Sequence, residues 1–66
     1  MLIYLNGEER PVTGNLTVNT LLEEIGFAGK RVAVEVNQEI VPRSNYTEFL
    51  INDNDRVEVV RAIGGG

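Results

Sequence analysis

The chain contains no cysteine, no histidine and no tryptophan. Without cysteine it has no disulfide and no thiolate nucleophile, and without histidine it lacks the usual general base and the commonest metal ligand. Its apolar start, Met1 to Leu5, is too short for a signal-peptide core or a membrane-spanning helix. We therefore expect no metal site, no catalytic residues and no membrane insertion.

The 66 residues suffice for one small domain with one core. Ten acidic residues against six basic ones give a net charge of −4, which repels nucleic-acid phosphates, so we expect no nucleic-acid partner. The absence of cysteine is consistent with a reducing compartment. We predict a cytoplasmic protein that is a monomer when free.

The first half of the sequence predicts a hairpin followed by a helix. A strand at 2–5 precedes Asn6-Gly7, the dipeptide that favours a tight hairpin turn, and a second strand at about 9–12 is an edge strand because Pro11 has no amide hydrogen to donate. Thr17 is a candidate N-cap, and Gly26 is a candidate helix stop. Between them the apolar residues recur at helical spacing: Val18, Leu21, Leu22 and Ile25.

The second half predicts more strands. Residues 31–36 alternate between apolar and polar, as expected of a half-buried strand, and the last strand runs from Arg56 to about Ala62 with Val57 and Val59 inward. Between these strands we expect a turn at 37–39, a short strand at 40–41, core residues at 49–51 and a turn at 52–55.

This order, written ββαββ, predicts an α+β fold of the ubiquitin-like β-grasp type. One mixed sheet packs on one helix, with the last strand parallel to the first. We assign residues 1–62 to this domain and 63–66 to a flexible C-terminal tail. The expected core consists of Ile3, Leu5, Val18, Leu21, Leu22, Ile25, Val32, Val34, Val57 and Val59.

Clustered carboxylates occur at 8–9, 23–24 and 53–55. We interpret them as solvated surface, because adjacent glutamates on a helix diverge and so small a domain offers little cleft. Asp53-Asn54-Asp55 resembles part of a calcium-binding loop but lacks the glycine and the distal glutamate of that motif, so we predict a turn.

Strand parity places Leu2, Tyr4 and Val60 on the sheet face away from the helix. They could form a small apolar patch on which a partner docks. The alternative is that they are scattered apolar surface residues, which are normal in soluble proteins. Both interpretations stay open at the sequence level.

The chain ends in Gly64-Gly65-Gly66. Glycine has no Cβ, so an extended glycine end can pass through a narrow channel and bring its carboxylate to a reactive centre. That carboxylate is ionised at neutral pH and unreactive until ATP converts it to an acyl-adenylate, which requires a separate enzyme. A frayed terminus or a remnant of expression remains the alternative.

The stretch Val36-Asn37-Gln38-Glu39-Ile40-Val41-Pro42-Arg43, the final Gly65-Gly66, the length and the fold order resemble the ThiS sulfur carrier family of thiamine biosynthesis. Two features depart from the family pattern: there are three terminal glycines where two are usual, and Asp53-Asn54-Asp55 stands where Asp-Gly-Asp is usual. Asparagine tolerates the left-handed conformation that such a turn requires, so the turn should survive.

The resemblance implies a mechanism. An E1-like enzyme adenylates the carboxylate of Gly66 with ATP, a cysteine desulfurase or related donor supplies sulfur, and the resulting thiocarboxylate passes to thiazole synthase. Gly64 and Gly65 would thread the tail into the partner. The chain itself would be a carrier rather than an enzyme, and it would bind no cofactor.

Three alternatives remain at this point. The chain could be the small subunit of molybdopterin synthase, which uses the same tail chemistry. It could be another ubiquitin-like carrier or a protein modifier, although Lys30 is its single lysine for self-conjugation. It could also be an interaction module in which the glycines have no role.

Overall fold

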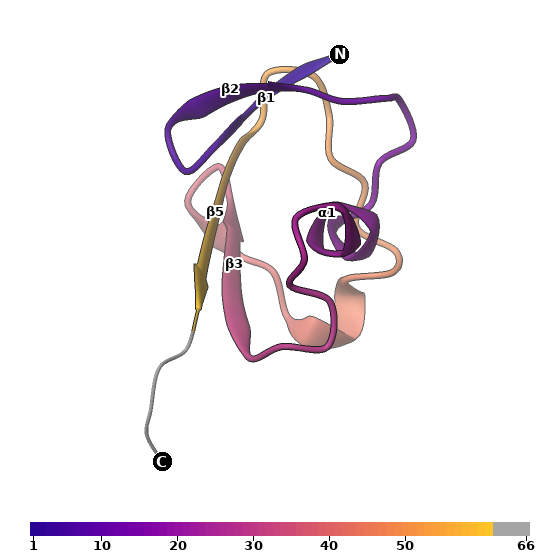
Figure 1. Ribbon diagram of the computed structural model, residues 1–66, viewed down its shortest axis with the longest axis vertical. Helices are drawn as coiled ribbons and strands as arrows, with labels where there is room; N and C mark the ends of the chain where they lie inside the picture. The colour runs from indigo at the N-terminus through magenta and orange to yellow at the C-terminus, as the bar shows by residue number, and fades with distance from the viewer. Residues whose placement is uncertain (62–66) are drawn as a thin grey trace.

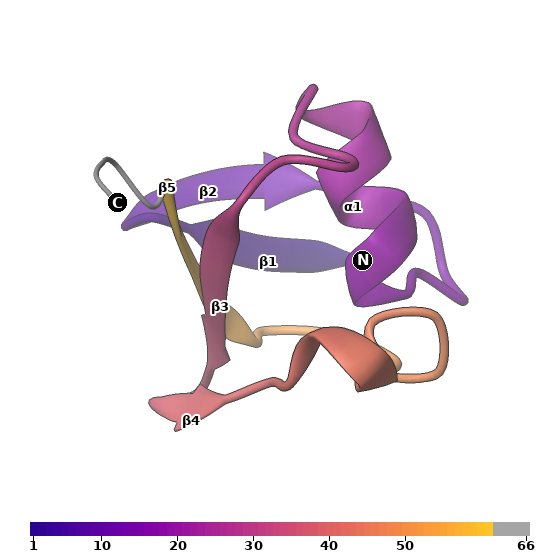
Figure 2. The ribbon, with the colours of Figure 1, turned by 90° about the horizontal axis from the view of Figure 1, so that it is seen from below.

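A computed structural model describes residues 1–61, and Figure 1 shows α1 packed on one side of a strongly twisted sheet. The elements are β1 (Leu2–Leu5), β2 (Glu8–Pro11), α1 (Val18–Glu24), β3 (Val32–Val36), β4 (Glu39–Ile40), the 3-10 helix η1 (Arg43–Asn45) and β5 (Arg56–Arg61). The strand order is β2-β1-β5-β3-β4, with β2 and β4 at the two edges (Figure 2).

The connectivity is that of the predicted β-grasp. β1 and β5 run parallel at the centre of the sheet, and the other neighbouring strands are antiparallel. The sheet has five strands, because the short strand expected at 40–41, which the notation ββαββ leaves uncounted, forms at 39–40 and pairs with β3. Each described strand begins and ends within one residue of its expected limit. The expected tail at 63–66, and Ala62 before it, lie outside the described residues.

The hairpin β1–β2 turns at Asn6 and Gly7, as predicted. Their φ angles of +50° and +84° are those of a type I′ turn, whose twist matches that of the flanking strands. β2 is an edge strand, in agreement with the expectation based on Pro11.

Both predicted ends of α1 are confirmed. The Thr17 side chain caps the helix by accepting a hydrogen bond from the Thr20 amide at 3.1 Å. At the other end Gly26 has a φ of +83°, and the Phe27 amide donates to the Leu22 carbonyl at 2.7 Å. These are the features of a Schellman motif, which satisfies carbonyls that the last turn leaves free.

The long segment between β4 and β5 packs under the N-terminal end of α1. The amides of Val18 and Asn19, which have no partner within the helix, donate to the carbonyls of Phe49 (3.0 Å) and Tyr46 (2.9 Å). Ile51 donates to the Leu16 carbonyl at 2.8 Å. This segment therefore closes the core on the side that the sheet leaves open.

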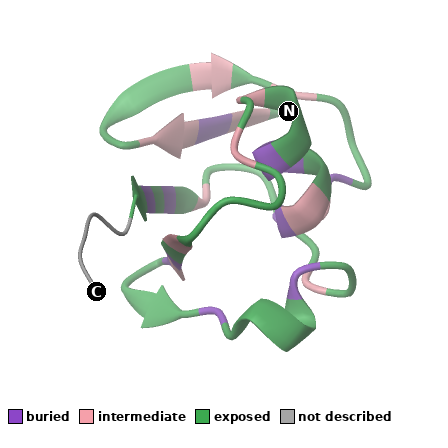
Figure 3. Ribbon diagram, turned by 60° about the horizontal axis from the view of Figure 1, so that its bottom comes forward, coloured by how far each residue is buried: buried purple, intermediate pink, exposed green. Residues whose placement is uncertain are grey.

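The core lies between α1, the inner face of the sheet and this segment. Figure 3 shows buried and exposed residues alternating along β5, as the strand pattern predicts. The buried apolar residues are Ile3, Leu16, Val18, Leu21, Leu22, Val34, Val36, Val41, Tyr46, Ile51, Val57 and Val59.

The expected core list is wrong in two respects. Leu5, Ile25 and Val32 are only partly buried, because they lie at the margin of the cluster. The list also omits Leu16, Val36, Val41 and Tyr46, which are buried, whereas the separate expectation that Ile51 adds core material is confirmed. Leu50, expected to add core material, is 53% exposed, because its backbone pairs with Thr17 in an isolated bridge while its neighbours face inward.

Candidate functional site at the end of the central strand

The residues proposed to carry the chemistry, Gly64, Gly65 and Gly66, lie outside the described part of the chain. The structure instead defines the strand that precedes them. β5 ends at Arg61, at the end of the molecule away from the N-terminus (Figure 1). Its last residues pair with β3, Val60 opposite Ala33 and Arg61 opposite Val32.

β5 is held on both sides. On one side it forms an antiparallel ladder with β3 from Val57 to Arg61, and on the other it runs parallel to β1. The β1 pairing is short, with Tyr4 opposite Arg56 and Leu5 opposite Val57. β5 therefore extends beyond the end of β1.

Two turn asparagines bond to the backbone of β5 through their side chains. The Asn37 side-chain oxygen accepts from the Arg56 amide at 3.0 Å, and the Asn6 side-chain oxygen accepts from the Val59 amide at 2.9 Å. Both asparagines have positive φ, +52° and +50°. Sequence reasoning used Asn6 only as a turn former, and nothing in the local pattern indicates its contact with a strand more than fifty residues away.

The register of β1 against β5 separates the members of the expected docking patch into two groups. Leu2, Tyr4 and Val60 do lie on the sheet face away from α1, and Val60 is 62% exposed. Tyr4, however, stands opposite Arg56, four residues before Val60 on β5. At about 3.3 Å per residue this separation is about 13 Å, so Leu2 and Tyr4 lie at one end of the face and Val60 at the other.

The two parts of this face have different surroundings. The Arg56 guanidinium lies over the Tyr4 ring, 5.2 Å from its centroid, so Tyr4 has a cationic neighbour within its own chain. Val60 has the exposed Ala33 beside it and lies one residue before the end of β5. Val60 is therefore the member of the expected patch that a protein engaging the chain beyond Arg61 would meet first.

The carboxylates of the turn before β5 serve the fold. The Asp53 side chain accepts from the Leu2 amide at 2.8 Å, and Asp55 accepts from the Asn52 amide (2.8 Å) and the Asn37 side chain (3.0 Å). This confirms the turn predicted there. Within residues 1–61 no three acidic side chains gather as a metal site would require, and no helix is long and apolar enough to cross a membrane.

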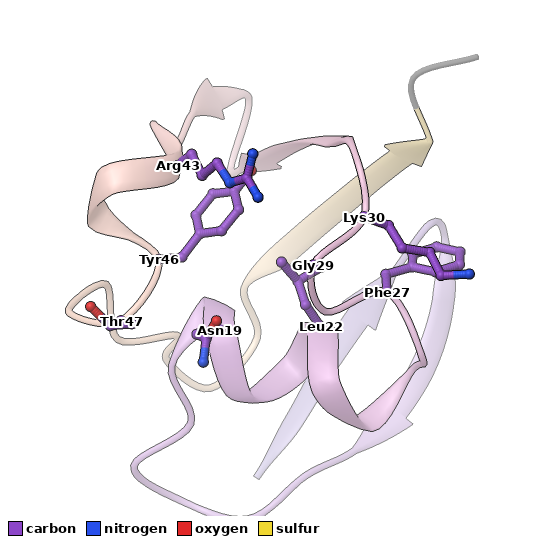
Figure 4. A pocket seen from close by; sticks show the side chains of 8 residues that line it. All are labelled: Asn19, Leu22, Phe27, Gly29, Lys30, Arg43, Tyr46 and Thr47. Carbon is purple, nitrogen blue, oxygen red and sulfur yellow. The ribbon is translucent and has the colours of Figure 1, made fainter. Parts of the chain in front are cut away.

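A hollow of about 280 Å³ lies between α1, the loop after it and the segment that follows η1. Figure 4 shows its lining, which includes the cations Lys30 and Arg43 and the rings of Phe27 and Tyr46. Lys30 extends away from Arg43 in this view, and both are exposed. Because the two charges do not converge and the hydroxyl of Tyr46 already donates to the Val32 carbonyl at 3.4 Å, we do not assign the hollow a ligand.

A small β-grasp domain whose central strand leads into a glycine-terminated tail is the architecture of the ubiquitin-like carriers. A family model described as "ThiS family" matches residues 3–66. The chain belongs to the ThiS family.

Individual relatives agree with this assignment. The chain is 40% identical over 65 residues to the sulfur carrier protein ThiS of Thermus thermophilus, covering 98% of this chain and 100% of the relative. A crystal structure of the thiamine biosynthesis protein ThiS from Geobacter metallireducens superposes with a TM-score of 0.86 at 32% identity, covering both chains completely.

Some relatives are much longer than this chain. A thiazole synthase of Paramagnetospirillum magneticum is 48% identical over 66 residues, which are all of this chain but 20% of that protein. A thiazole synthase of Magnetococcus marinus is matched over the same fraction of its length. The chain thus spans about a fifth of the length of these relatives.

Proposed function

We propose that this chain is a sulfur carrier whose C-terminal glycine, Gly66, is adenylated and then converted to a thiocarboxylate that donates sulfur for thiazole formation in thiamine biosynthesis. The observation that carries the proposal is the family match, which extends through the last residue, Gly66. Relatives of the same length bear the name sulfur carrier protein.

The chemistry needs little from the domain itself. ATP and the terminal carboxylate give an acyl-adenylate and pyrophosphate, and the sulfur of a persulfide then attacks the acyl carbon and expels AMP. Reductive cleavage of the resulting acyl disulfide by a thiol leaves the thiocarboxylate. Since the chain has no cysteine, its carboxyl end is the position that can hold sulfur in this way. The chain is therefore a substrate and carrier, not a catalyst.

The partners follow from these steps. An E1-like adenylating enzyme binds the ATP, a cysteine desulfurase or related protein supplies the persulfide, and thiazole synthase takes the sulfur. The relatives named thiazole synthase, which contain a segment similar to this chain, support the last partner. We place the protein in the cytoplasm, because its lack of cysteine is consistent with a reducing compartment.

We infer that the adenylating enzyme docks near the end of β5, where Val60 is exposed beside Ala33. From there the chain has five residues after Arg61 with which to reach an active site. At about 3.3 to 3.6 Å per residue they span about 17 Å when extended. Because Gly64 and Gly65 have no Cβ, they suit a narrow approach over that distance.

The test is ATP-dependent pyrophosphate release followed by intact mass. With the adenylating enzyme, ATP and a persulfide donor, replacement of one oxygen by sulfur should raise the mass by about 16 Da. Deleting Gly65 and Gly66 should abolish both signals. Gly65→Val should fold equally well but react poorly, because a β-branched side chain widens the tail and restricts its backbone.

Lys30→Arg is the matched control for modification elsewhere, because it removes the single lysine and keeps the charge. It should gain the same mass as the unaltered protein. A mass increase that persists after the tail is shortened, or that disappears in Lys30→Arg, would contradict the proposal. Loss of the added mass on incubation with thiazole synthase and its other substrates tests the thiamine assignment against the molybdopterin alternative.

A further inference from the structure

The last residues of β5 have a strand on one side only. β3 accompanies β5 to Arg61, whereas the pairing with β1 stops at Leu5 opposite Val57. The Asn6 amide still donates to the Val57 carbonyl at 2.8 Å. Beyond that point the hairpin turns back into β2, and the backbone of Val59 would face no strand on the β1 side.

The Asn6 side chain takes the place of the missing strand. Its Oδ1 accepts from the Val59 amide at 2.9 Å, and its Nδ2 donates to the Val59 carbonyl at 3.3 Å. A side-chain amide has the same donor and acceptor as a peptide group, so this pair reproduces the two bonds that a neighbouring strand would make. Both bonds are partly buried, which protects them from competing water.

The turn makes this contact possible. Asn6 has a φ of +50°, a conformation that asparagine tolerates better than most residues, and it is the first residue after β1. Aspartate favours such turns as well but has no donor for the Val59 carbonyl, and glycine has no side chain at all. Asparagine alone among the common residues of this turn position meets both requirements.

We infer that Asn6 is a positioning residue, which fixes the direction in which the chain continues beyond Arg61 by holding Val59 from the side that β1 leaves open. The inference rests on the proposed function of the tail. Without Asn6, the segment from Val59 to Arg61 is an edge bonded to β3 alone. It can then twist away from the sheet, and the carboxylate is presented to the adenylating enzyme in many orientations rather than few.

Asn37 provides a matched control. Its side-chain oxygen accepts from the Arg56 amide at 3.0 Å, its own amide donates to the Arg56 carbonyl at 2.8 Å, and its φ is +52°. It therefore holds the same strand from a turn of the same geometry, but at the end remote from the tail. Asn6→Gly and Asn37→Gly both retain backbone freedom at positive φ while removing the side-chain bonds.

The experiment compares the two variants in the whole chain under conditions in which both are folded by circular dichroism. The readouts are kcat for pyrophosphate release at saturating carrier and the hydrogen-exchange rate of the Val59 amide. For Asn6→Gly we expect kcat to fall about tenfold, because misdirection of a reacting group by about 1 Å is costly, and Val59 to exchange faster. Asn37→Gly should leave kcat unchanged.

These readouts separate positioning from stability. Partial unfolding lowers the concentration of competent carrier, so it raises the apparent KM and leaves kcat at saturation unaltered. An unchanged kcat in Asn6→Gly, or an equal fall in both variants, would overturn the inference while leaving the carrier function standing. Absence of pyrophosphate release with the unaltered chain would overturn both.

Discussion

Three leucine-to-alanine substitutions test how the core is built, because the same chemical change meets three environments. Leu21 is fully buried between α1 and the sheet, Leu22 is 3% exposed and lines the hollow shown in Figure 4, and Leu50 is 53% exposed. The cost of such a substitution is the lost transfer free energy plus a term for the cavity that remains. The cost in unfolding free energy should therefore be largest for Leu21→Ala, smaller for Leu22→Ala and smallest for Leu50→Ala.

The magnitudes follow from the burial. Leu21→Ala leaves an enclosed void, so we expect a loss in the upper half of the usual range, about 3.5 to 5 kcal/mol. The void at Leu22 opens toward the hollow and can be partly filled, which suggests about 2 to 3.5 kcal/mol. Leu50→Ala should cost less than about 1 kcal/mol. A domain of this length has roughly 3 to 10 kcal/mol in all, so Leu21→Ala should leave a substantial unfolded population.

Urea unfolding followed by far-ultraviolet circular dichroism measures these differences. A slope of about 1 kcal/mol per molar urea, expected for a small domain, converts each kcal/mol into a shift of about 1 M in the midpoint. A cost of Leu50→Ala equal to that of Leu22→Ala would refute the placement of Leu50 at the surface. A cost of Leu21→Ala below about 1 kcal/mol would refute the position of α1 on the sheet.

Further expectations concern the helix ends and the docking surface. Thr17→Ala removes the helix cap and should cost about 1 kcal/mol in the same urea assay, whereas no measurable loss would show that the cap contributes nothing. Gly26→Ala should cost about 1 to 2 kcal/mol of unfolding free energy. The cost comes from its φ of +83° alone, because an added Cβ would meet nothing within 4 Å. Gly14→Ala is the control, because an added Cβ there also meets nothing but the φ is not positive. Val60→Asp should weaken binding to the adenylating enzyme while the fold stays intact, at a cost in the urea assay of no more than about 1 kcal/mol from the lower strand propensity of aspartate, and unchanged affinity would place the contact elsewhere.

Much of the fold was predictable because its signals are local. Asn6-Gly7, Thr17 and Gly26 each act on the backbone within a few residues, and each adopts the conformation that its chemistry favours. The alternation along β5 identified its inward face, because strand periodicity does not depend on the identity of the neighbouring strand. The predictions made from such signals are confirmed.

The segment between β4 and β5 was harder to predict because it has neither period. Val41, Tyr46 and Ile51 are buried at intervals of five residues, which match neither the helix period nor the strand period, and Leu50 lies exposed among them. Their burial depends on the hydrogen bonds that tie this segment to Leu16 and to the start of α1. Such contacts between distant segments are fixed only when the whole chain has folded.

In the candidate site, too, some features were predictable from the local sequence and others depend on contacts between distant segments. The terminal glycines are a property of the sequence and suggested activation of the terminal carboxylate directly, whereas the sulfur transfer was implied by the resemblance to the ThiS family. The separation of Tyr4 from Val60 and the bonds between Asn6 and Val59 depend on the register of β1 against β5. No local pattern determines the register of a parallel pair whose strands lie near opposite ends of the sequence.

The position of β5 explains why this fold suits a carrier that is handled through its end. A terminal strand at an edge could be drawn away from the sheet when a partner engages the chain beyond it, because one ladder of hydrogen bonds would resist. β5 lies at the centre, with β3 on one side and β1, continued by Asn6, on the other. Its inward residues Val57 and Val59 are also buried in the core. Pulling β5 out of the sheet would therefore require the whole domain to unfold. For this reason the domain can present its terminus to a modifying protein and remain folded.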